Sequence, residues 1–305
     1  MRFLIAGSSG FLGTHLRERL AAEGHEVIRL VRRSPGTGEV QWDPYAGTVD
    51  RAAVEAADVV VNLAGTPTIG NPHSKTWARN LRESRVTTTR VLAEAVAASE
   101  RKPDFLAQNA IAGYGDHGDT PVPEDTPLTA DTLLGKVTRE WQAVTEPAAE
   151  AGARVCVLRT AVVLDRRSAP LKQQLLQFKA GGGGRLGSGR QYYPVITTRD
   201  WVAAAAFVAT HETVSGPVNL SAPQAPTNAE FTSALAERVH RPAVLHVPAA
   251  VLKVTAGPMA PEILNSVRVV PQVLLDAGHA FADPDIGAML DTALSAGPSA
   301  APSAG

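Results

Sequence analysis

Short apolar runs alternate with longer amphipathic stretches through the first half of the chain. Apolar runs of strand length cover residues 2–6, 26–31, 58–62, 104–110 and 154–158. Helical spacing of apolar residues covers residues 14–23, 74–99 and 131–151. Strands that alternate with longer helices predict an α/β fold of the Rossmann type, with a doubly wound parallel sheet. Right-handed crossovers would bring the carboxyl ends of the strands to one edge, where ligands bind.

The second half of the chain has a different pattern. Glycines cluster at residues 181–184 and 187–189, which predicts a flexible loop, and prolines interrupt residues 217–261. Short helices are expected over residues 199–210, 228–239 and 271–277. We expect residues 1–165 to form a nucleotide-binding domain and residues 166–290 to complete the sheet and form a small substrate lobe. Residues 291–305 end in a run of Ala, Ser, Pro and Gly and are expected to be a disordered tail.

The first strand runs directly into a glycine-rich loop, Gly7-Ser8-Ser9-Gly10-Phe11-Leu12-Gly13, and then into a helix. Gly7 permits a tight turn, and Gly10 has no side chain to block a pyrophosphate that approaches the backbone. Gly13 allows the helix to pack closely on the strand, and the first free N–H groups of the helix point at the phosphate. This placement predicts a dinucleotide ligand. The alternative is an ordinary glycine-rich turn between a strand and a helix.

The end of the second strand decides between the two nicotinamide cofactors. An acidic residue there would bind the free 2′-hydroxyl of NAD, but the chain has Leu30-Val31-Arg32-Arg33-Ser34. A guanidinium can hold a 2′-phosphate by paired, charge-assisted hydrogen bonds, so Arg32 favours NADP(H). The alternative is that both arginines are solvated charges at a strand end.

The third strand closes with small residues that let the backbone pass close to the adenine ribose and pyrophosphate. The alternative for this segment is a plain strand-to-loop turn. The predicted cofactor contacts are Gly7, Ser9, Gly10, Phe11, Leu12, Gly13, Arg32, Asn62, Leu63, Ala64 and Gly65.

Composition narrows the remaining classes. The chain has 305 residues, 44% of them hydrophobic, and a formal net charge of −1, which is typical of a soluble globular protein and gives no reason to expect nucleic acid. No apolar stretch is long enough to span a membrane, and no signal peptide is recognisable. The single cysteine, Cys156, lies in a strand-like run and is expected to be buried and inert, which fits the cytoplasm. The histidines lack metal-ligand spacing, so we expect no metal.

Together, the glycine loop, the strand that ends in Arg32 and the segment Asn62–Gly65 resemble the short-chain dehydrogenase/reductase superfamily. More narrowly, the chain is similar to its atypical or extended branch, which resembles sugar-nucleotide epimerases. Further segments support this resemblance, which spans residues 1–290: Ser84–Thr87, Gly113–Gly115, Glu140–Trp141, Leu158–Leu164, Gly183–Gln191, Asn219–Pro223, Arg241–Pro242, Val247–Pro248 and Val269–Pro271. The resemblance implies an NADP(H)-binding fold with a C-terminal lobe over the active site.

The catalytic residues of the superfamily are not all present. Its general acid/base is a tyrosine, activated by a lysine four residues later on the same helix face. None of the chain's four tyrosines has such a lysine, and Thr132 stands where the tyrosine would be, four residues before Lys136. A threonine hydroxyl is shorter and far less acidic than a phenol.

The resemblance therefore leaves three candidate roles besides Thr132. Lys136 could anchor the ribose of the cofactor, or it could be a solvated helix lysine. Asn109 stands near the usual serine or threonine and could donate a hydrogen bond to a carbonyl. Tyr114 is the best remaining proton donor, although in related folds this tyrosine mainly shapes the pocket.

The presumed substrate pocket also departs from the family pattern. Val195-Ile196-Thr197, Thr66 and Pro258 stand where polar or ionisable groups are typical, so we expect a small, fairly apolar substrate. The first hypothesis is an NADP(H)-dependent oxidoreductase or epimerase-like enzyme that acts on a carbonyl compound or an alcohol. The second is a non-redox isomerase, lyase or cyclase on the same fold. The third is a non-catalytic NADP(H)-binding sensor. The sequence does not indicate an oligomeric state.

Overall fold

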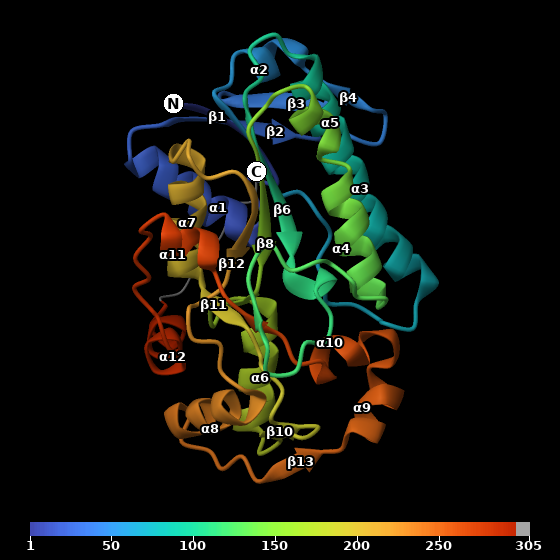
Figure 1. Cartoon of the computed structure of the whole chain (residues 1–305), viewed down its shortest axis with the longest axis vertical. Coiled ribbons are helices and arrows are strands. Elements are labelled where there is room, and N and C mark those ends of the chain that lie inside the picture. Colours follow the sequence, from blue (N-terminus) through green and yellow to red (C-terminus); the bar gives the residue numbers. More distant parts are fainter. Residues whose placement is uncertain (297–305) are drawn as a thin grey trace.

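The computed structural model describes residues 1–296, and its centre is one twisted sheet of eight strands (Figure 1). Across the sheet the order is β12 (Gly216–Leu220), β8 (Val155–Thr160), β6 (Asp104–Ala110), β5 (Val59–Asn62), β1 (Arg2–Ala6), β2 (Glu26–Val31), β3 (Glu39–Asp43) and β4 (Thr48–Val49). All neighbours are parallel except β3 and β4, which form an antiparallel pair. The Rossmann-type α/β fold is thereby confirmed.

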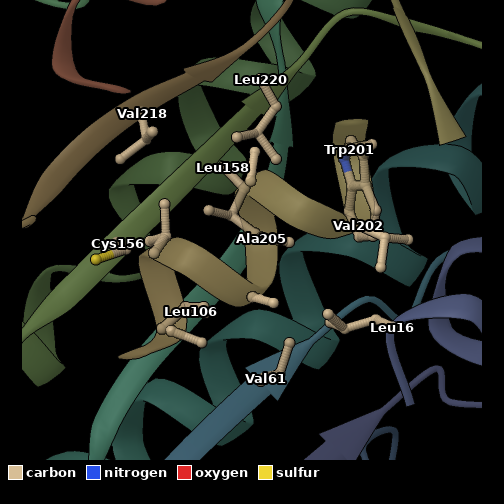
Figure 2. Packing of buried hydrophobic residues seen from close by; sticks show 14 of the residues in the cluster. Leu16, Val61, Leu106, Cys156, Leu158, Trp201, Val202, Ala205, Val218 and Leu220 are labelled. Atoms are coloured by element: carbon tan, nitrogen blue, oxygen red, sulfur yellow. The ribbon is translucent and has the colours of Figure 1, made fainter. Parts of the chain in front are cut away.

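Helices cover both faces of this sheet. One face carries α1 (Phe11–Ala22), α7 (Thr198–Thr210) and α11 (Gln272–Asp276). The other carries α2 (Arg51–Glu55), α3 (Lys75–Ala98), α4 (Leu133–Ala143) and α5 (Glu146–Glu150). In the first layer, Trp201 of α7 and Leu16 of α1 pack with Leu158 of β8 (Figure 2). Because both sheet faces are covered, the central strands are mainly apolar, which is why the sequence shows them clearly.

One expected helix is divided in two. Residues 131–151 were expected to form a single helix, but α4 ends at Ala143 and α5 begins at Glu146. Pro147 lies in the first turn of α5, where its missing N–H is tolerated. A proline in the interior of one continuous helix would instead remove a hydrogen bond and clash with the preceding turn, so the chain restarts the helix here.

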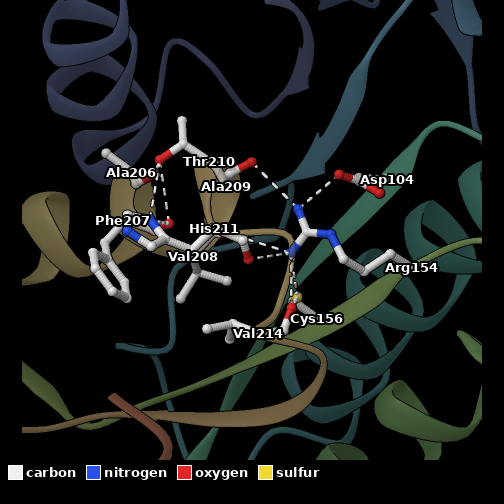
Figure 3. A network of polar contacts seen from close by, with 10 residues as sticks. All are labelled: Asp104, Arg154, Cys156, Ala206, Phe207, Val208, Ala209, Thr210, His211 and Val214. Carbon is white, nitrogen blue, oxygen red and sulfur yellow. Dashed lines mark hydrogen bonds and ion pairs between the residues drawn. The ribbon is translucent and has the colours of Figure 1, made fainter. Parts of the chain in front are cut away.

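Arg154 ties the amino-terminal side of the sheet to the end of α7 (Figure 3). Its Nη2 donates to Asp104 Oδ2 at 2.7 Å, and its Nη1 donates to the carbonyls of Val208 (3.1 Å) and Val214 (2.8 Å). The guanidinium thus satisfies carbonyl groups that have no partner inside the helix. This contact fixes α7 against β6 and β8, on the edge opposite the predicted ligand site.

A smaller lobe lies beyond the carboxyl ends of the strands, at the bottom of Figure 1. Its helices are α6 (Ala169–Lys179), α8 (Asn228–Arg238), α9 (Ala249–Thr255), α10 (Ala260–Leu264) and α12 (Ile286–Ser295). Three two-stranded parallel pairs join them: β9 (Val162–Leu164) with β11 (Val195–Thr197), β10 (Gly184–Leu186) with β13 (Leu245–Val247), and β7 (Pro121–Val122) with β14 (Arg268–Val269). Two short 3-10 helices, η1 (Ile111–Gly113) and η2 (Gly257–Met259), complete the elements.

Two expectations need correction. The glycine-rich segment is not simply a flexible loop, because residues 184–186 form β10. The tail expected from residue 291 is helical at its start, since α12 continues to Ser295, where Met289, Leu290 and Ala293 are buried in the lobe core. Residues 297–305 lie outside the described part of the chain. Within residues 1–296, no helix has the length and apolar character needed to cross a membrane.

Candidate functional site

The glycine loop brings β1, α1 and the end of β5 into direct contact. Gly7 has φ +76°, and the Gly10 N–H donates to the Gly7 carbonyl at 3.0 Å, which closes the turn. A Cβ on Gly7 would lie 2.5 Å from the carbonyl carbon of Leu63, and a Cβ on Gly13 would lie 2.2 Å from the Gly7 oxygen. Both positions therefore need glycine for close approach, as the sequence predicts.

The amino terminus of α1 is open to an anion. No side chain caps the helix at Gly10, and the first turn holds no acidic residue. Ser9 and Gly10 are exposed, and Phe11 and Leu12 are half-buried. The free N–H groups and the positive end of the helix dipole suit a pyrophosphate. The residues present therefore fit the phosphate part of a dinucleotide.

The arginines at the end of β2 have different surroundings. Arg33 donates to both carboxylate oxygens of Glu39, at 2.6 and 2.7 Å, and Arg29 bonds the same carboxylate. The Arg33 hydrogen bond is the main reason that the pKa of Glu39 falls to about 2. Arg32 is exposed and, within residues 1–296, has no side-chain hydrogen bond or ion pair. Arg32 is therefore the guanidinium available to a 2′-phosphate.

Asn62 supports the turn rather than lining it. Its side chain is fully buried, donates to Thr88 and Thr89 of α3 and accepts from the Ala64 N–H at 3.0 Å. The backbone of Leu63, Ala64 and Gly65 is thereby held against the glycine loop. These three residues remain at least partly exposed, so their backbone could contact a cofactor, whereas the Asn62 side chain positions them.

A cleft opens directly after this turn. Its volume is about 410 Å³, and its lining is Thr66, Pro67, Ile69, Ser74, Thr76, Trp77 and Asn80. Beside it, Arg85 of α3 donates to the Thr66 carbonyl at 3.1 Å and lies over the Trp141 ring. Burial lowers the pKa of Arg85 to about 10. The mixed apolar and hydroxyl lining can accept a small, weakly polar molecule.

The structure gathers Thr132, Lys136 and Asn109 around α4. The Thr132 hydroxyl caps the helix by accepting from the Gly135 N–H at 2.9 Å. Lys136 Nζ lies 3.0 Å from Asp131 Oδ1, and both side chains are exposed. Asn109 is buried, with Nδ2 donating to the Thr138 carbonyl at 3.2 Å. Lys136 is thus free to turn toward a ligand, whereas Asn109 is already engaged with α4.

The proposed proton donor Tyr114 does not face the cleft. Its side chain is fully buried, its hydroxyl donates to Asn219 Oδ1 at 2.7 Å, and Arg159 Nη1 donates to that hydroxyl at 2.7 Å. Burial raises the pKa of Tyr114. The structure thus places the Tyr114 hydroxyl between Asn219 and Arg159, and a catalytic role for Tyr114 stays a prediction.

The segment Val195-Ile196-Thr197 does not line this cleft. All three side chains are fully buried in β11. Thr197 caps α7 and donates to Asp283 Oδ2 at 2.7 Å. These residues stabilise the junction between sheet and lobe, so they give no support for an apolar substrate.

A profile described as the NAD dependent epimerase/dehydratase family matches residues 3–221. The chain belongs to this family. A second profile, a domain of unknown function designated DUF1731, matches residues 247–293, which include α9, α10 and α11. The lobe side of this epimerase-family chain therefore has its own recognisable sequence pattern.

Relatives match the epimerase-family chain over nearly its whole length. An epimerase family protein of Mycobacterium leprae is 38% identical over 291 residues, covering 95% of this chain and 94% of the relative. The human epimerase family protein SDR39U1 is 33% identical over 295 residues, covering 95% and 98%.

Two solved structures extend the comparison. A crystal structure of human SDR39U1 (isoform 2) with NADPH superposes with a TM-score of 0.85 at 30% identity, over 96% of this chain and 99% of that one. A nucleoside-diphosphate sugar epimerase from Corynebacterium glutamicum has a TM-score of 0.78 at 33% identity, over 96% of this chain and 58% of that longer one.

Three polar residues near the site were not singled out from the sequence: Arg159 and Glu124, which are buried, and Glu262, which is half-buried. Arg159 lies in the segment Leu158–Leu164, but its partners Tyr114 and Gln142 are distant in the chain. Glu124 accepts from the Asn219 N–H at 3.0 Å, and burial raises the pKa of Glu124. Glu262 of α10 contacts Thr132. An isolated acidic residue inside an apolar run is the one sequence signal that Glu262 offered. The described part of the chain holds no cluster of three His, Cys, Asp or Glu side chains that could bind a metal.

Proposed function

We propose that the protein is an NADP(H)-dependent oxidoreductase, or an epimerase-like enzyme, that acts on a small and relatively apolar carbonyl compound or alcohol. The observation that carries this proposal is the free guanidinium of Arg32 at the end of β2, beside the uncapped start of α1. The relative crystallised with NADPH supports the same cofactor for this chain. The single cysteine, Cys156, is a free and buried thiol, which suits the reducing cytoplasm in which we place the activity.

Different residues of the chain would bind different parts of the cofactor. The N–H groups of Phe11, Leu12 and Gly13 would hold the pyrophosphate, and Arg32 would hold the 2′-phosphate by charge-assisted bonds. The backbone of Leu63–Gly65 would border the adenosine ribose, and Lys136 would turn from Asp131 toward the nicotinamide ribose. When bound, the cofactor supplies hydride transfer. The cleft beside Thr66 would hold the substrate and limit the access of water.

The second candidate is non-redox chemistry on the same fold. It is favoured by one observation: among the described residues that line the cleft there is no tyrosine, since Tyr114 is buried and residue 132 is a threonine. An isomerisation or elimination would not need that proton donor. Substrate turnover without any change in the absorbance of the bound cofactor would support this second reading.

Calorimetric titration with NADPH and NADH tests the main proposal. Wild type should prefer NADPH, and Arg32→Glu should weaken NADPH binding by roughly 10- to 100-fold, because a hydrogen bond to a charged group is worth about 1.5–3 kcal/mol. Arg33→Ala is the matched control, since Glu39 already holds Arg33. NADPH binding that is equally strong in wild type and Arg32→Glu would refute the assignment. Failure of the wild type to bind either nucleotide would refute the cofactor site itself.

A further inference from the structure

A carboxyl group from the lobe reaches the position that lacks a tyrosine. Thr132 Oγ1 donates to Glu262 Oε1 at 2.8 Å, across 130 residues of sequence. Thr132 begins α4, which packs on β6, and Glu262 lies on α10. The contact therefore spans the boundary between the nucleotide-binding half and the lobe, at the carboxyl edge of the sheet.

The surroundings of Glu262 favour its neutral form. The residue is half-buried, and burial raises the pKa of Glu262, while the Thr132 hydrogen bond acts in the opposite direction. Within residues 1–296 no lysine, arginine or histidine forms an ion pair with this carboxyl. On the α4 side, Lys136 forms its ion pair with Asp131. The titratable side chain of His73 lies against the segment before α10, where it contacts Gly257 of η2 and the Thr255 carbonyl and not Glu262.

The lobe holds α10 at a defined place. Gln191 Nε2 donates to the Ile263 carbonyl at 3.3 Å, and Gly187 lies so close to Leu264 that a Cβ there would be 2.8 Å from Leu264 Cδ2. The last two residues of α10, directly after Glu262, are thus fixed by the loop 187–191. A carboxyl positioned in this way, with one hydroxyl partner and no counter-charge, has the properties of a general acid.

We propose that Glu262 is the proton donor of this enzyme, in place of the phenol that the superfamily uses, and that Thr132 positions it. This inference rests on the proposed function. In the reduction of a carbonyl compound, the carbonyl carbon receives hydride from NADPH and the carbonyl oxygen receives the proton of the Glu262 carboxyl. The products are an alcohol, NADP⁺ and the Glu262 carboxylate, which keeps its Thr132 hydrogen bond and takes a new proton from water. In the oxidation of an alcohol the same groups act in reverse.

The alternative is that the contact only tethers the lobe to α4. Direct titration separates the two roles, because the nicotinamide ring of NADP⁺ is cationic and that of NADPH is not. The protein is labelled with glutamate carrying ¹³C at the side-chain carboxyl, and the Glu262 signal is identified by its loss in Glu262→Gln. A carboxyl beside the reactive ring should titrate at a lower pH in the NADP⁺ complex than in the NADPH complex. Equal pKa values in the two complexes would overturn the proposal.

Turnover provides the second test. Glu262→Gln keeps an oxygen that accepts from Thr132 but cannot supply a proton, so kcat for any carbonyl that the wild type reduces should fall about 100-fold or more. Its NADPH affinity should be unchanged, and the decline of wild-type kcat toward high pH should disappear. Glu237→Gln, which removes an exposed carboxylate of the same lobe, should behave as wild type.

The two tests also distinguish the inference from the function on which it rests. Wild-type kcat in Glu262→Gln, with NADPH still bound, would overturn the role of Glu262 alone. Absence of NADPH binding by the wild type would instead refute the proposed function.

Discussion

Alanine should have different consequences at two positions of the glycine loop. Gly13→Ala should mainly destabilise the fold, whereas Gly10→Ala should mainly weaken NADPH binding. A Cβ at position 13 would lie 2.2 Å from the Gly7 oxygen and 2.8 Å from Ser8 Cα, whereas ordinary contact begins near 3.4 Å. Both obstructing atoms belong to the backbone and cannot rotate away, so α1 would have to move by about 1 Å. A Cβ at position 10 would meet only the Gly7 oxygen, at 3.2 Å, and Gly10 has φ −71°, which alanine adopts readily.

The magnitudes follow from these contacts. Overpacking of this kind costs about 3 kcal/mol at its upper end. The better helix propensity of alanine offsets about 1 kcal/mol. Gly13→Ala should therefore lower the free energy of unfolding by about 2 kcal/mol. Gly10→Ala should change it by about 0.5 kcal/mol or less, but its methyl group would stand in front of the free N–H groups of α1 and weaken NADPH binding about tenfold or more.

Urea denaturation and calorimetric NADPH titration on both variants measure these two effects. Thr14→Ala, one residue further along α1, is a control that adds no atoms to the loop. Wild-type stability in Gly13→Ala would refute the close-packing argument. Unchanged NADPH affinity in Gly10→Ala would refute the placement of the pyrophosphate over this helix terminus.

Two further predictions concern stability. Arg154→Met should lower the free energy of unfolding by about 2–4 kcal/mol, because Asp104 and the carbonyl groups at the end of α7 lose their donor. Urea denaturation measures this loss, Asp104→Asn should cost less, and wild-type stability in Arg154→Met would contradict the role of the guanidinium. Glu39 has a folded pKa of about 2, below its ordinary 4.5, so its contribution to stability is complete above pH 4.5 and is lost as the pH falls toward 2. In acid-unfolding curves, Glu39→Gln should reduce the pH dependence in that range, and an unchanged curve would exclude the ion pairs with Arg29 and Arg33.

The strands that the sequence revealed are those buried on both faces. The runs that became β1, β2, β5, β6 and β8 are continuous and apolar because helices cover both sides of the sheet. The β3–β4 pair was missed, since its exposed edge position allows polar residues such as Gln41. β12 was not singled out from the sequence, and Pro217 lies within it. The proline is tolerated there because β12 is an edge strand that pairs only with β8.

The site was predictable only where the chemistry is local. The glycine loop and Arg32 are read from neighbouring residues, and the structure leaves both available to a ligand. The burial of Tyr114 could not be predicted, because its hydroxyl contacts Arg159 and Asn219, which are 45 and 105 residues away. The Thr132–Glu262 contact spans 130 residues, and no periodic pattern in the sequence indicates it. Tertiary contacts between polar side chains leave little trace in a single sequence.

The three small parallel pairs of the lobe also set an order for events during synthesis. β7 at residues 121–122 cannot pair until β14 at residues 268–269 has been synthesised, and β10 likewise needs β13. These pairs therefore form only when late segments leave the ribosome. The loop and turn expected to hold the nucleotide are complete by Gly65, long before Glu262 exists. A nascent chain would thus complete the segments around the glycine loop before it contains the lobe segments that close these pairs.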